Sequence, residues 1–312
     1  METLKSTTEK YHSTFIDWDT KSYVRSKPHS LKKFKKNKTF FSQKLAFLFK
    51  HPEVINQSQK VKNELLVYHL YNYIEFTVWL ELGPVNEVCD LIRKPSFLPW
   101  LPSTMKDDAL KIYVDEGGHA EMAHALRERV LEFTNLKPFK FEPSFLQTLN
   151  YIIESEPKEL TNLIKVFFVI ISETLITGTL SVLPNDESVQ ISVREFARDH
   201  AMDEGKHHAY FRQLFEYLFA RLPREMKIKI GRLLPKMILA FLKPDSNLFV
   251  KILERFPKQF PYPSKIVEEL LTNDEMILGI KASAKPTIAM LRYNSVFEYK
   301  IIEETFKEYN LI

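Results

Sequence analysis

The sequence predicts an all-α protein built on a four-helix core with additional peripheral helices. Alternation of apolar and polar residues typical of strands is scarce, and long stretches instead have helical periodicity. Prolines divide these stretches into units of helix length. We expect a single domain over residues 1–312. It has an irregular N-terminal arm at 1–41, a short helical pattern at 42–50, a helical core at 58–221 and C-terminal helices at 222–312.

The first half of the core contains two long helical patterns. One spans about 58–92, and Pro84 interrupts it, so we expect a kink or local unwinding there. The second spans about 103–135, and Ser103 or Thr104 can cap its N-terminus.

The second half of the core repeats this arrangement. Residues 144–183 have a helical pattern that we expect to break at Pro157, and a further helix is predicted over about 187–221. The remaining residues predict shorter helices separated by prolines. These are Pro235, Pro244, Pro257, Pro261, Pro263 and Pro286.

Two copies of one motif, Glu116-x-x-His119 and Glu204-x-x-His207, lie within long helices. This spacing places a carboxylate and an imidazole about one turn apart on the same helix face. His200 precedes Glu204 by four residues and therefore shares its narrow stripe. The spacing predicts two helices that each direct metal ligands into the core.

Glu81 and Glu173 lie on the helices that precede each motif. With the two motifs they complete the ligand set of a ferritin-like di-metal carboxylate site. Four carboxylates in a protein core are prohibitive unless cations neutralise them, and two divalent metals do so. Carboxylate and imidazole ligands without thiolate favour iron or manganese.

Asp115 and Asp203 each precede a glutamate of one motif. Carboxylates near metal sites commonly accept a hydrogen bond from the outer nitrogen of a ligand histidine and thereby fix its tautomer. We expect Asp203 to support His119 and Asp115 to support His207.

Five of the seven glycines lie within five residues of a proposed ligand. Glycine within a helix costs about 1 kcal/mol relative to alanine, so this clustering indicates a role. Two explanations fit Gly83 and Gly178 equally well. Glycine can leave space for dioxygen and substrate, or it can allow helices to pack closely. The Gly117-Gly118 pair favours a cavity. Gly205 is the fifth.

Other acidic residues compete for the carboxylate positions, and Glu75 replaces Glu81 if the kink lies elsewhere. The remaining competitors are Glu64, Glu87, Glu121 and Glu195. His69 and His208 lack a partnering pattern, which favours structural roles, whereas His124 points away from the ligand stripe, toward residues that surround the ligands or toward the surface.

Composition restricts the classes of protein. The single cysteine, Cys89, excludes an internal disulfide framework and fits a reducing cytoplasm. The basic run at 32–36 indicates a solvated arm rather than a nucleic-acid patch. Residues 1–14 lack the apolar region of a secretory signal. The apolar run 163–183 contains Glu173, so a core helix fits better than a membrane span. We expect a cytoplasmic protein without nucleic-acid or membrane partners.

The ligand spacing resembles that of the AurF-type di-iron N-oxygenases, the family of p-aminobenzoate N-oxygenase. Glu116 follows Glu81 by thirty-five positions, and His200 follows Glu173 by twenty-seven. The additional histidine before the second Glu-x-x-His distinguishes this family from ferritins. The resemblance covers about residues 60–220.

The resemblance implies two iron ions, or a manganese–iron pair, held by seven side chains. Glu116 and Glu204 would bridge the metals at the O2-activating centre. Glu81 and His119 would complete one metal site. The implied ligands are Glu81, Glu116, His119, Glu173, His200, Glu204 and His207, of which Glu173, His200 and His207 would complete the second site.

Members of this family use O2 to oxidise an amine to the hydroxylamine and, in some cases, to nitroso and nitro products. The resemblance therefore implies a small-molecule amine substrate, an electron donor that the sequence does not identify, a homodimer and a role in secondary-metabolite biosynthesis. Larger residues often occupy the Gly117-Gly118 positions in the family. The two glycines therefore imply a wider or differently shaped pocket, which leaves open both an aromatic amine and an aliphatic one derived from an amino acid.

Two other functions are compatible with such a ligand set. One is a di-iron or manganese–iron oxidase that hydroxylates, desaturates or cleaves at carbon. The other is a non-catalytic, ferritin-like metal-binding bundle. The third histidine and the extra helices argue against the latter.

Overall fold

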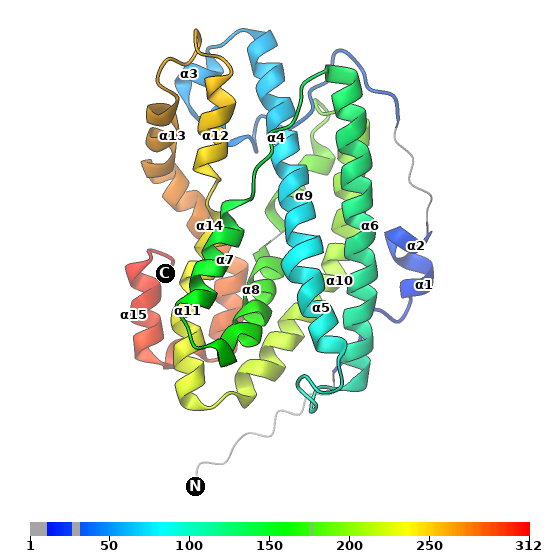
Figure 1. Ribbon diagram of the computed structural model, residues 1–312, viewed down its shortest axis with the longest axis vertical. Helices are drawn as coiled ribbons and strands as arrows, with labels where there is room; N and C mark the ends of the chain where they lie inside the picture. The colour runs from blue at the N-terminus through cyan, green and yellow to red at the C-terminus, as the bar shows by residue number, and fades with distance from the viewer. Residues whose placement is uncertain (1–10, 27–31, 176) are drawn as a thin grey trace.

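Four long helices surround a common interior in the computed structural model, which describes residues 11–26, 32–175 and 177–312. The side chains of 177–179 are excluded from the description. Helices α4, α6, α10 and α8 pack in a closed ring, in which α5, the continuation of α4, contacts α8 (Figure 1). The core helices are α4 (Gln59–Leu80), α5 (Asn86–Arg93), α6 (Ser103–Thr134), α8 (Thr161–Leu175) and α10 (Ile191–Arg221). This confirms the predicted all-α, ferritin-like core.

The kink expected near Pro84 is a turn of π-helix, η2 (Glu81–Val85), between α4 and α5. Within it Gly83 departs from helical geometry, with φ −89° and ψ −106°. Proline cannot donate the helical hydrogen bond, and π-turns inside helices are frequent at functional sites. The first residue of this turn is Glu81, which the distortion presents to α6 and α8.

The N-terminal arm, predicted to be irregular and partly helical, contains two short helices among its described residues. Two short helices, α1 (Trp18–Lys21) and α2 (Tyr23–Ser26), lie beside α6, and α2 also contacts α10 (Figure 1). Residues 1–10 and 27–31 of the arm lie outside the described residues. The helical pattern at 42–50 yields only a 3-10 turn, η1 (Phe47–Lys50), which is followed by α3 (Pro52–Ile55).

Helix ends differ from expectation at two places. Ser103 is the first residue of α6 rather than its cap, and Pro102 occupies the N-cap position without a side-chain hydrogen bond. Helix α10 begins at Ile191 rather than near 187. The preceding segment is held in a turn, in which the Ser188 N–H and hydroxyl both donate to Asp186 Oδ1 at 3.0 and 2.6 Å.

The segment between α6 and α10 breaks at Pro157, as predicted. It contains α7 (Ser144–Glu154), η3 (Lys158–Leu160), α8, α9 (Thr177–Val182) and η4 (Leu183–Asn185). The 28-residue stretch Lys158–Asn185 is, among the described residues, the one long and apolar enough to cross a membrane. Its most apolar window is 86% buried inside the protein, as in a core helix.

The C-terminal helices pack against the outer side of α8. Both α11 and α14 contact α8, and α15 contacts α11 (Figure 1). The expectation that Pro235 and Pro286 separate helices is wrong, because they lie inside α11 and α14, where tertiary packing offsets the lost hydrogen bond. The elements are α11 (Arg224–Leu242), α12 (Ser246–Glu254), α13 (Pro263–Thr272), α14 (Asp274–Tyr293), η5 (Val296–Glu298) and α15 (Lys300–Glu308).

Two apolar clusters fill the bundle, one toward each end. On α6 the segment 105–112 belongs to one cluster and 122–130 to the other; on α10 the segments are 210–219 and 193–197. The ligand motifs lie between these segments on both helices. The core therefore contains a polar layer enclosed by two apolar layers.

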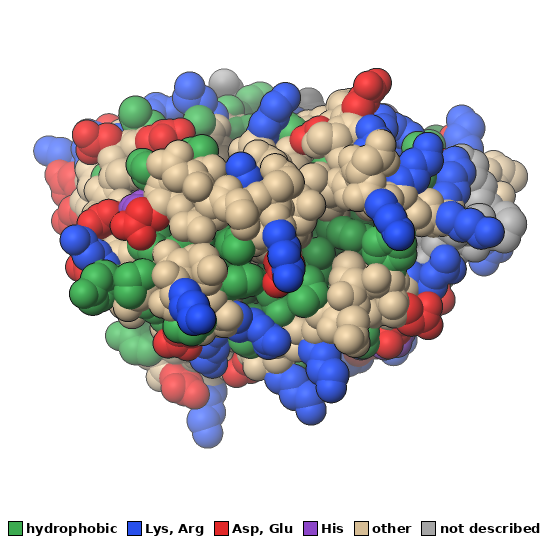
Figure 2. Space-filling view, turned by 90° about the horizontal axis from the view of Figure 1, so that it is seen from above, with side chains coloured by type: hydrophobic (Ala, Val, Ile, Leu, Met, Phe, Trp, Pro, Cys, Tyr) green, Lys and Arg blue, Asp and Glu red, His purple; other side chains and the backbone are tan. Residues whose placement is uncertain are grey.

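The face seen from above in Figure 2 carries Lys and Arg side chains dispersed around hydrophobic side chains, rather than gathered in one patch. The net charge of the whole chain is a small +4. A dispersed charge is typical of a solvated surface rather than of a phosphate-binding stripe.

Candidate metal centre

All seven predicted ligands are buried and converge between α4, α6, α8 and α10. They form two groups whose ligand atoms lie within 4.8 Å of one another. One group consists of Glu81, His119, His200 and Glu204, and the other of Glu116, Glu173, Glu204 and His207. Each of these seven side chains is at most 3% exposed. The helical spacing of the two motifs therefore delivers its side chains to one interior volume.

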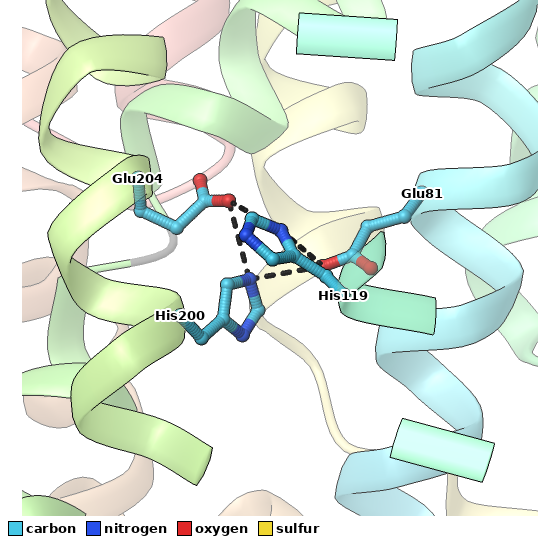
Figure 3. Close-up of side chains that lie close together, drawn as sticks. All are labelled: Glu81, His119, His200 and Glu204. Carbon is cyan, nitrogen blue, oxygen red and sulfur yellow. Dashed lines mark hydrogen bonds and ion pairs between the residues drawn. The ribbon is translucent and has the colours of Figure 1, made fainter. Parts of the chain in front are cut away.

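In the first group the imidazoles of His119 and His200 lie between two carboxylates (Figure 3). His200 Nε2 is 2.9 Å from Glu81 Oε1 and 3.1 Å from Glu204 Oε1. His119 Nδ1 is 3.6 Å from Glu204 Oε1 and 3.9 Å from Glu81 Oε1. Four potential ligand atoms thus face one point.

The carboxylates of Glu116 and Glu204 face both groups. Glu116 directs Oε2 to His119 Nδ1 and Oε1 to His207 Nδ1, both at 3.1 Å. Glu204 Oε1 is 3.1 Å from His207 Nδ1 and also belongs to the first group. This is the arrangement that two bridging carboxylates require, and it supports that role as a proposal.

The structure divides the histidines differently from the arrangement implied by the resemblance. His200 lies with Glu81 and His119, not with Glu173 and His207. The reason is geometric: the π-turn presents Glu81 toward the N-terminal end of the α10 motif, where His200 lies. Glu204 belongs to both groups, and each group has three further side chains of its own. The first group contains two histidines and the second contains one.

The donor set fits two divalent cations. Ligands about 2.1 Å from a metal lie about 3 Å from one another in an octahedron, which matches the 2.9–3.1 Å separations between ligand atoms here. Each of Glu81, Glu116, Glu173 and Glu204 has a buried carboxylate oxygen without a hydrogen-bond partner among the described residues. Such orphaned atoms are unfavourable unless a cation or donor satisfies them.

The protonation behaviour of the carboxylates separates central from peripheral ligands. Burial, together with the charges of Glu204 and Glu116, raises the pKa of Glu173 well above its usual range. Burial raises the pKa of Glu81 to about 7, against the opposing effect of His200. Despite burial, His207 and His200 hold the pKa of Glu204 well below its usual range. The carboxylate of Glu204, which belongs to both groups, is therefore ionised. The carboxylates of Glu173 and Glu81 ionise less readily, and a nearby cation would favour their ionised forms.

The neighbouring carboxylates raise the pKa values of the ligand histidines His119 and His207. Burial and the neighbouring His200 oppose protonation of His119, but hydrogen bonds to Asp203 and Glu116 outweigh them and raise its pKa to about 9. His207 behaves alike: burial opposes protonation, and the carboxylates of Glu204 and Glu116 raise its pKa well above the usual range. Metal binding would displace these protons.

Asp115 and Asp203 make the reciprocal contacts that the sequence predicts. His119 Nε2 donates to Asp203 Oδ2, and His207 Nε2 donates to Asp115 Oδ2, both at 3.3 Å. Each aspartate therefore leaves Nδ1 of its histidine directed at the ligand cluster. This is the pairing that fixes a ligand tautomer.

Residues of the N-terminal arm donate hydrogen bonds to both aspartates, Asp115 and Asp203. The sequence alone did not predict these contacts. Trp18 Nε1 donates to both oxygens of Asp115 at 2.9 Å, and the Ser22 hydroxyl donates to Asp115 Oδ1 at 2.6 Å. The Tyr23 backbone N–H donates to Asp203 at 3.1 Å. These partners are more than ninety residues apart in sequence, so local pattern carries no signal for them.

Comparison with known families agrees with this geometry. A family model described as p-aminobenzoate N-oxygenase AurF matches residues 3–293. The chain belongs to the AurF family. A search of curated proteins found no match. The match to the AurF family extends beyond the 60–220 region of the sequence resemblance and includes the arm segment that holds Asp115 and Asp203. Family membership supports an oxygenase, and the two ligand groups could hold its metals.

One glycine of this AurF-family member, Gly118, does not open the cavity that the sequence predicts. A Cβ on Gly118 would lie 2.4 Å from Val24 Cγ2, so this glycine permits α2 to pack on α6. Among the described residues, no such contact exists within 4 Å at Gly117, Gly83 or Gly205. The cavity interpretation is therefore wrong for Gly118. Gly178 lies outside the residues whose surroundings are described.

The competing acidic residues are not among the two ligand groups. Glu75 pairs with Arg127 Nη1 at 2.7 Å, and Glu87 pairs with Lys165 Nζ at 2.6 Å. Glu195 pairs with Lys32 of the basic run. The remaining two, Glu64 and Glu121, also lie outside both groups, as do His69, His124 and His208.

A cavity of about 580 Å³ lies along α4, and its described lining residues do not include the seven ligands themselves. Its wall includes Thr77, one turn before Glu81, and Leu175, two residues after Glu173. Tyr73 also lines it, and burial together with the charge of Glu81 raises the pKa of the phenol well above its usual range. The cavity therefore lies within about one helical turn of Glu81 along the chain.

Proposed function

We propose that the protein is an O2-dependent non-haem di-iron monooxygenase that oxidises the amine nitrogen of a small molecule to the hydroxylamine, nitroso or nitro level. The observation that carries this proposal is the pair of buried ligand groups joined by Glu116 and Glu204 in a member of the AurF family. Two irons, when bound, supply the reducing equivalents and Lewis acidity for O2 chemistry.

The chain's own residues have distinct roles in this proposal. Asp115 and Asp203 each accept a hydrogen bond from one ligand histidine and keep its inner nitrogen directed at the metal position. The apolar layers above and below exclude bulk water from the cluster. The adjoining cavity admits the amine from the α4 side.

Several further features belong to the same proposal. We infer a cytoplasmic homodimer that receives electrons from a separate donor protein and acts in secondary-metabolite biosynthesis. These expectations rest on the family and on the cysteine-poor sequence.

The reaction is tested by mass spectrometry of amines incubated with iron-loaded, reduced protein and ¹⁸O2. Label on nitrogen supports the proposal. Label found solely on carbon would instead assign the protein to oxidases that act at carbon, and no label with any amine would favour a metal-binding bundle.

The ligand assignment is tested with His200→Ala. This change removes one nitrogen ligand from the first group, so we expect iron content to fall from about two to about one per chain, with folding retained. The matched control is His124→Ala, because His124 is exposed on α6 and outside both groups. Full iron content and turnover in His200→Ala would refute the seven-ligand assignment.

A further inference from the structure

The cavity beside the ligands has two chemically different walls. One wall is a polar stripe along a single face of α4, formed by His69, Asn72, Tyr73 and Thr77 and leading directly to Glu81. The other wall is aromatic. Its principal side chains are Phe41, Phe47, Phe141, Phe145, Phe241 and Phe249. At about 580 Å³ the cavity is within the range that accommodates drug-sized ligands.

Two polar atoms in this wall have no hydrogen-bond partner among the described residues, Tyr73 Oη and His69 Nε2. Both are buried atoms of residues that line the cavity. Buried polar atoms are normally paired, and leaving one unpaired is unfavourable. They are therefore available to a ligand in the cavity, one turn apart on the same helix face.

The polar wall is uncharged. Burial lowers the pKa of His69 to about 3, so its imidazole is neutral near pH 7. Burial and the charges of Glu81 and Glu204 keep the phenol of Tyr73 protonated by raising its pKa. Among the described lining residues the charged side chains are Lys243, which is exposed, and Asp245, whose carboxylate accepts hydrogen bonds from the backbone N–H groups of Ser144 and Leu248. A carboxylate placed inside this cavity would therefore lack a counter-charge, which is costly.

We propose that the substrate is an elongated, uncharged aromatic amine whose body fills this cavity, held by hydrogen bonds from its neutral polar groups to Tyr73 and His69. This assignment rests on the proposed N-oxygenation, since it deepens the description of that site. It differs from a compact aminobenzoate, whose carboxylate would be buried within one ring of the reacting nitrogen. Tyr73 and His69 are positioning residues: they orient the amine toward the Glu81 end of the cavity.

Binding of three probes to both metal-free and iron-loaded protein tests the proposal by calorimetry. 4-Aminobenzoate and 4-aminobenzamide have nearly the same size and differ in charge, whereas 4-aminobenzanilide is uncharged and longer. We expect the anilide to bind about tenfold more tightly than the benzamide, and the benzamide about tenfold more tightly than the benzoate. Tighter binding of 4-aminobenzoate than of 4-aminobenzamide would overturn the proposal.

Variants test which residues position the ligand. Tyr73→Phe removes one hydroxyl without changing shape and should weaken 4-aminobenzamide about tenfold, with the loss in KM rather than kcat for an oxidised amine. The matched control is Tyr71→Phe, because the Tyr71 hydroxyl already donates to the Leu136 carbonyl at 2.8 Å, and its probe affinity should not change. Equal effects of the two substitutions would refute the positioning role.

The variant Lys243→Ala tests whether the cationic side chain of Lys243 binds the substrate. Affinity for the uncharged probes should be unchanged. A tenfold loss of 4-aminobenzoate binding in this variant, from a wild type that binds it tightly, would show an anionic substrate anchored at the rim and overturn the proposal. If the probes bind in the expected order but acquire no oxygen on nitrogen, the proposed reaction fails, and what stands is a cavity that selects uncharged aromatic ligands.

Discussion

Gly118→Ala should leave the protein less stable than the same substitution at the adjacent Gly117. A methyl group on Gly118 would lie 2.4 and 2.5 Å from the two Cγ atoms of Val24, far inside van der Waals contact. Gly117 has no neighbouring atom within 4 Å of the position where its methyl group would lie. The two glycines are on the same long helix, α6, so they form a matched pair.

The expected difference in the free energy of unfolding follows from comparing the two substitutions. Both replace a glycine within a helix by alanine, which contributes about 1 kcal/mol to the free energy of unfolding. Gly118→Ala additionally overpacks the contact with α2, at a cost of about 1–3 kcal/mol. The difference between the two variants therefore isolates the clash, and we expect Gly117→Ala to be the more stable by about 1–3 kcal/mol.

The clash also tests the connection between the arm and the metal centre. Val24 follows Tyr23, whose backbone N–H donates to Asp203, so displacing α2 loosens the support of His119. We expect Gly118→Ala to weaken iron binding about tenfold, within the range for changes to groups that orient a ligand.

The assays are urea unfolding of the metal-free variants and titration with Fe(II) under anaerobic conditions. In a Val24→Ala background the difference in stability between the two alanine variants should largely disappear, because the clashing Cγ atoms are gone. Equal stability of Gly117→Ala and Gly118→Ala in the wild-type background would refute the packing argument. Retained iron affinity in Gly118→Ala would separate the arm from the metal centre.

Three further outcomes follow from the site. Trp18→Phe removes the indole N–H that donates to Asp115 and should lower iron affinity about tenfold with little change in fold, as measured by Fe(II) titration; an unchanged affinity would contradict the role of the arm. Glu173→Gln should leave the metal-free protein at least as stable in urea, because burial already disfavours the ionised carboxylate, yet reduce bound iron to about one per chain; two irons would contradict it. The buried imidazole of His69 has a pKa of about 3 against 6.5 in the unfolded chain, so the unfolded state binds the extra proton and stability is lost as pH falls from 6.5 toward 3. Between pH 7 and pH 5 the wild type should lose about 2 kcal/mol more than His69→Phe in urea unfolding, and parallel losses would contradict the burial of a neutral imidazole.

The local part of the site was predictable from the sequence because a helix converts spacing into direction. Glu116 and His119, three residues apart, lie on one face in any α-helix, and Pro84 removes a hydrogen bond wherever it occurs within one. The reciprocal contacts of Asp115 and Asp203 followed from the symmetry of the two motifs.

The rest depends on how the helices are offset along the bundle, which spacing does not encode. His200 lies beside Glu81 because the π-turn shifts that carboxylate relative to α10. Gly118 permits a contact with Val24, a residue more than ninety positions away, rather than open space. Packing between distant segments fixes both features, and neither leaves a periodic signal in the sequence.

The number of irons bound per chain tests the central claim most directly. After anaerobic loading with Fe(II) and removal of unbound metal, elemental analysis should give about two irons per chain for the wild type. Glu204 belongs to both ligand groups, so Glu204→Gln should retain fewer than one, whereas the exposed Glu121→Gln should retain two. A wild type that binds one iron or none, or a Glu204→Gln variant that keeps two, would contradict the di-metal centre.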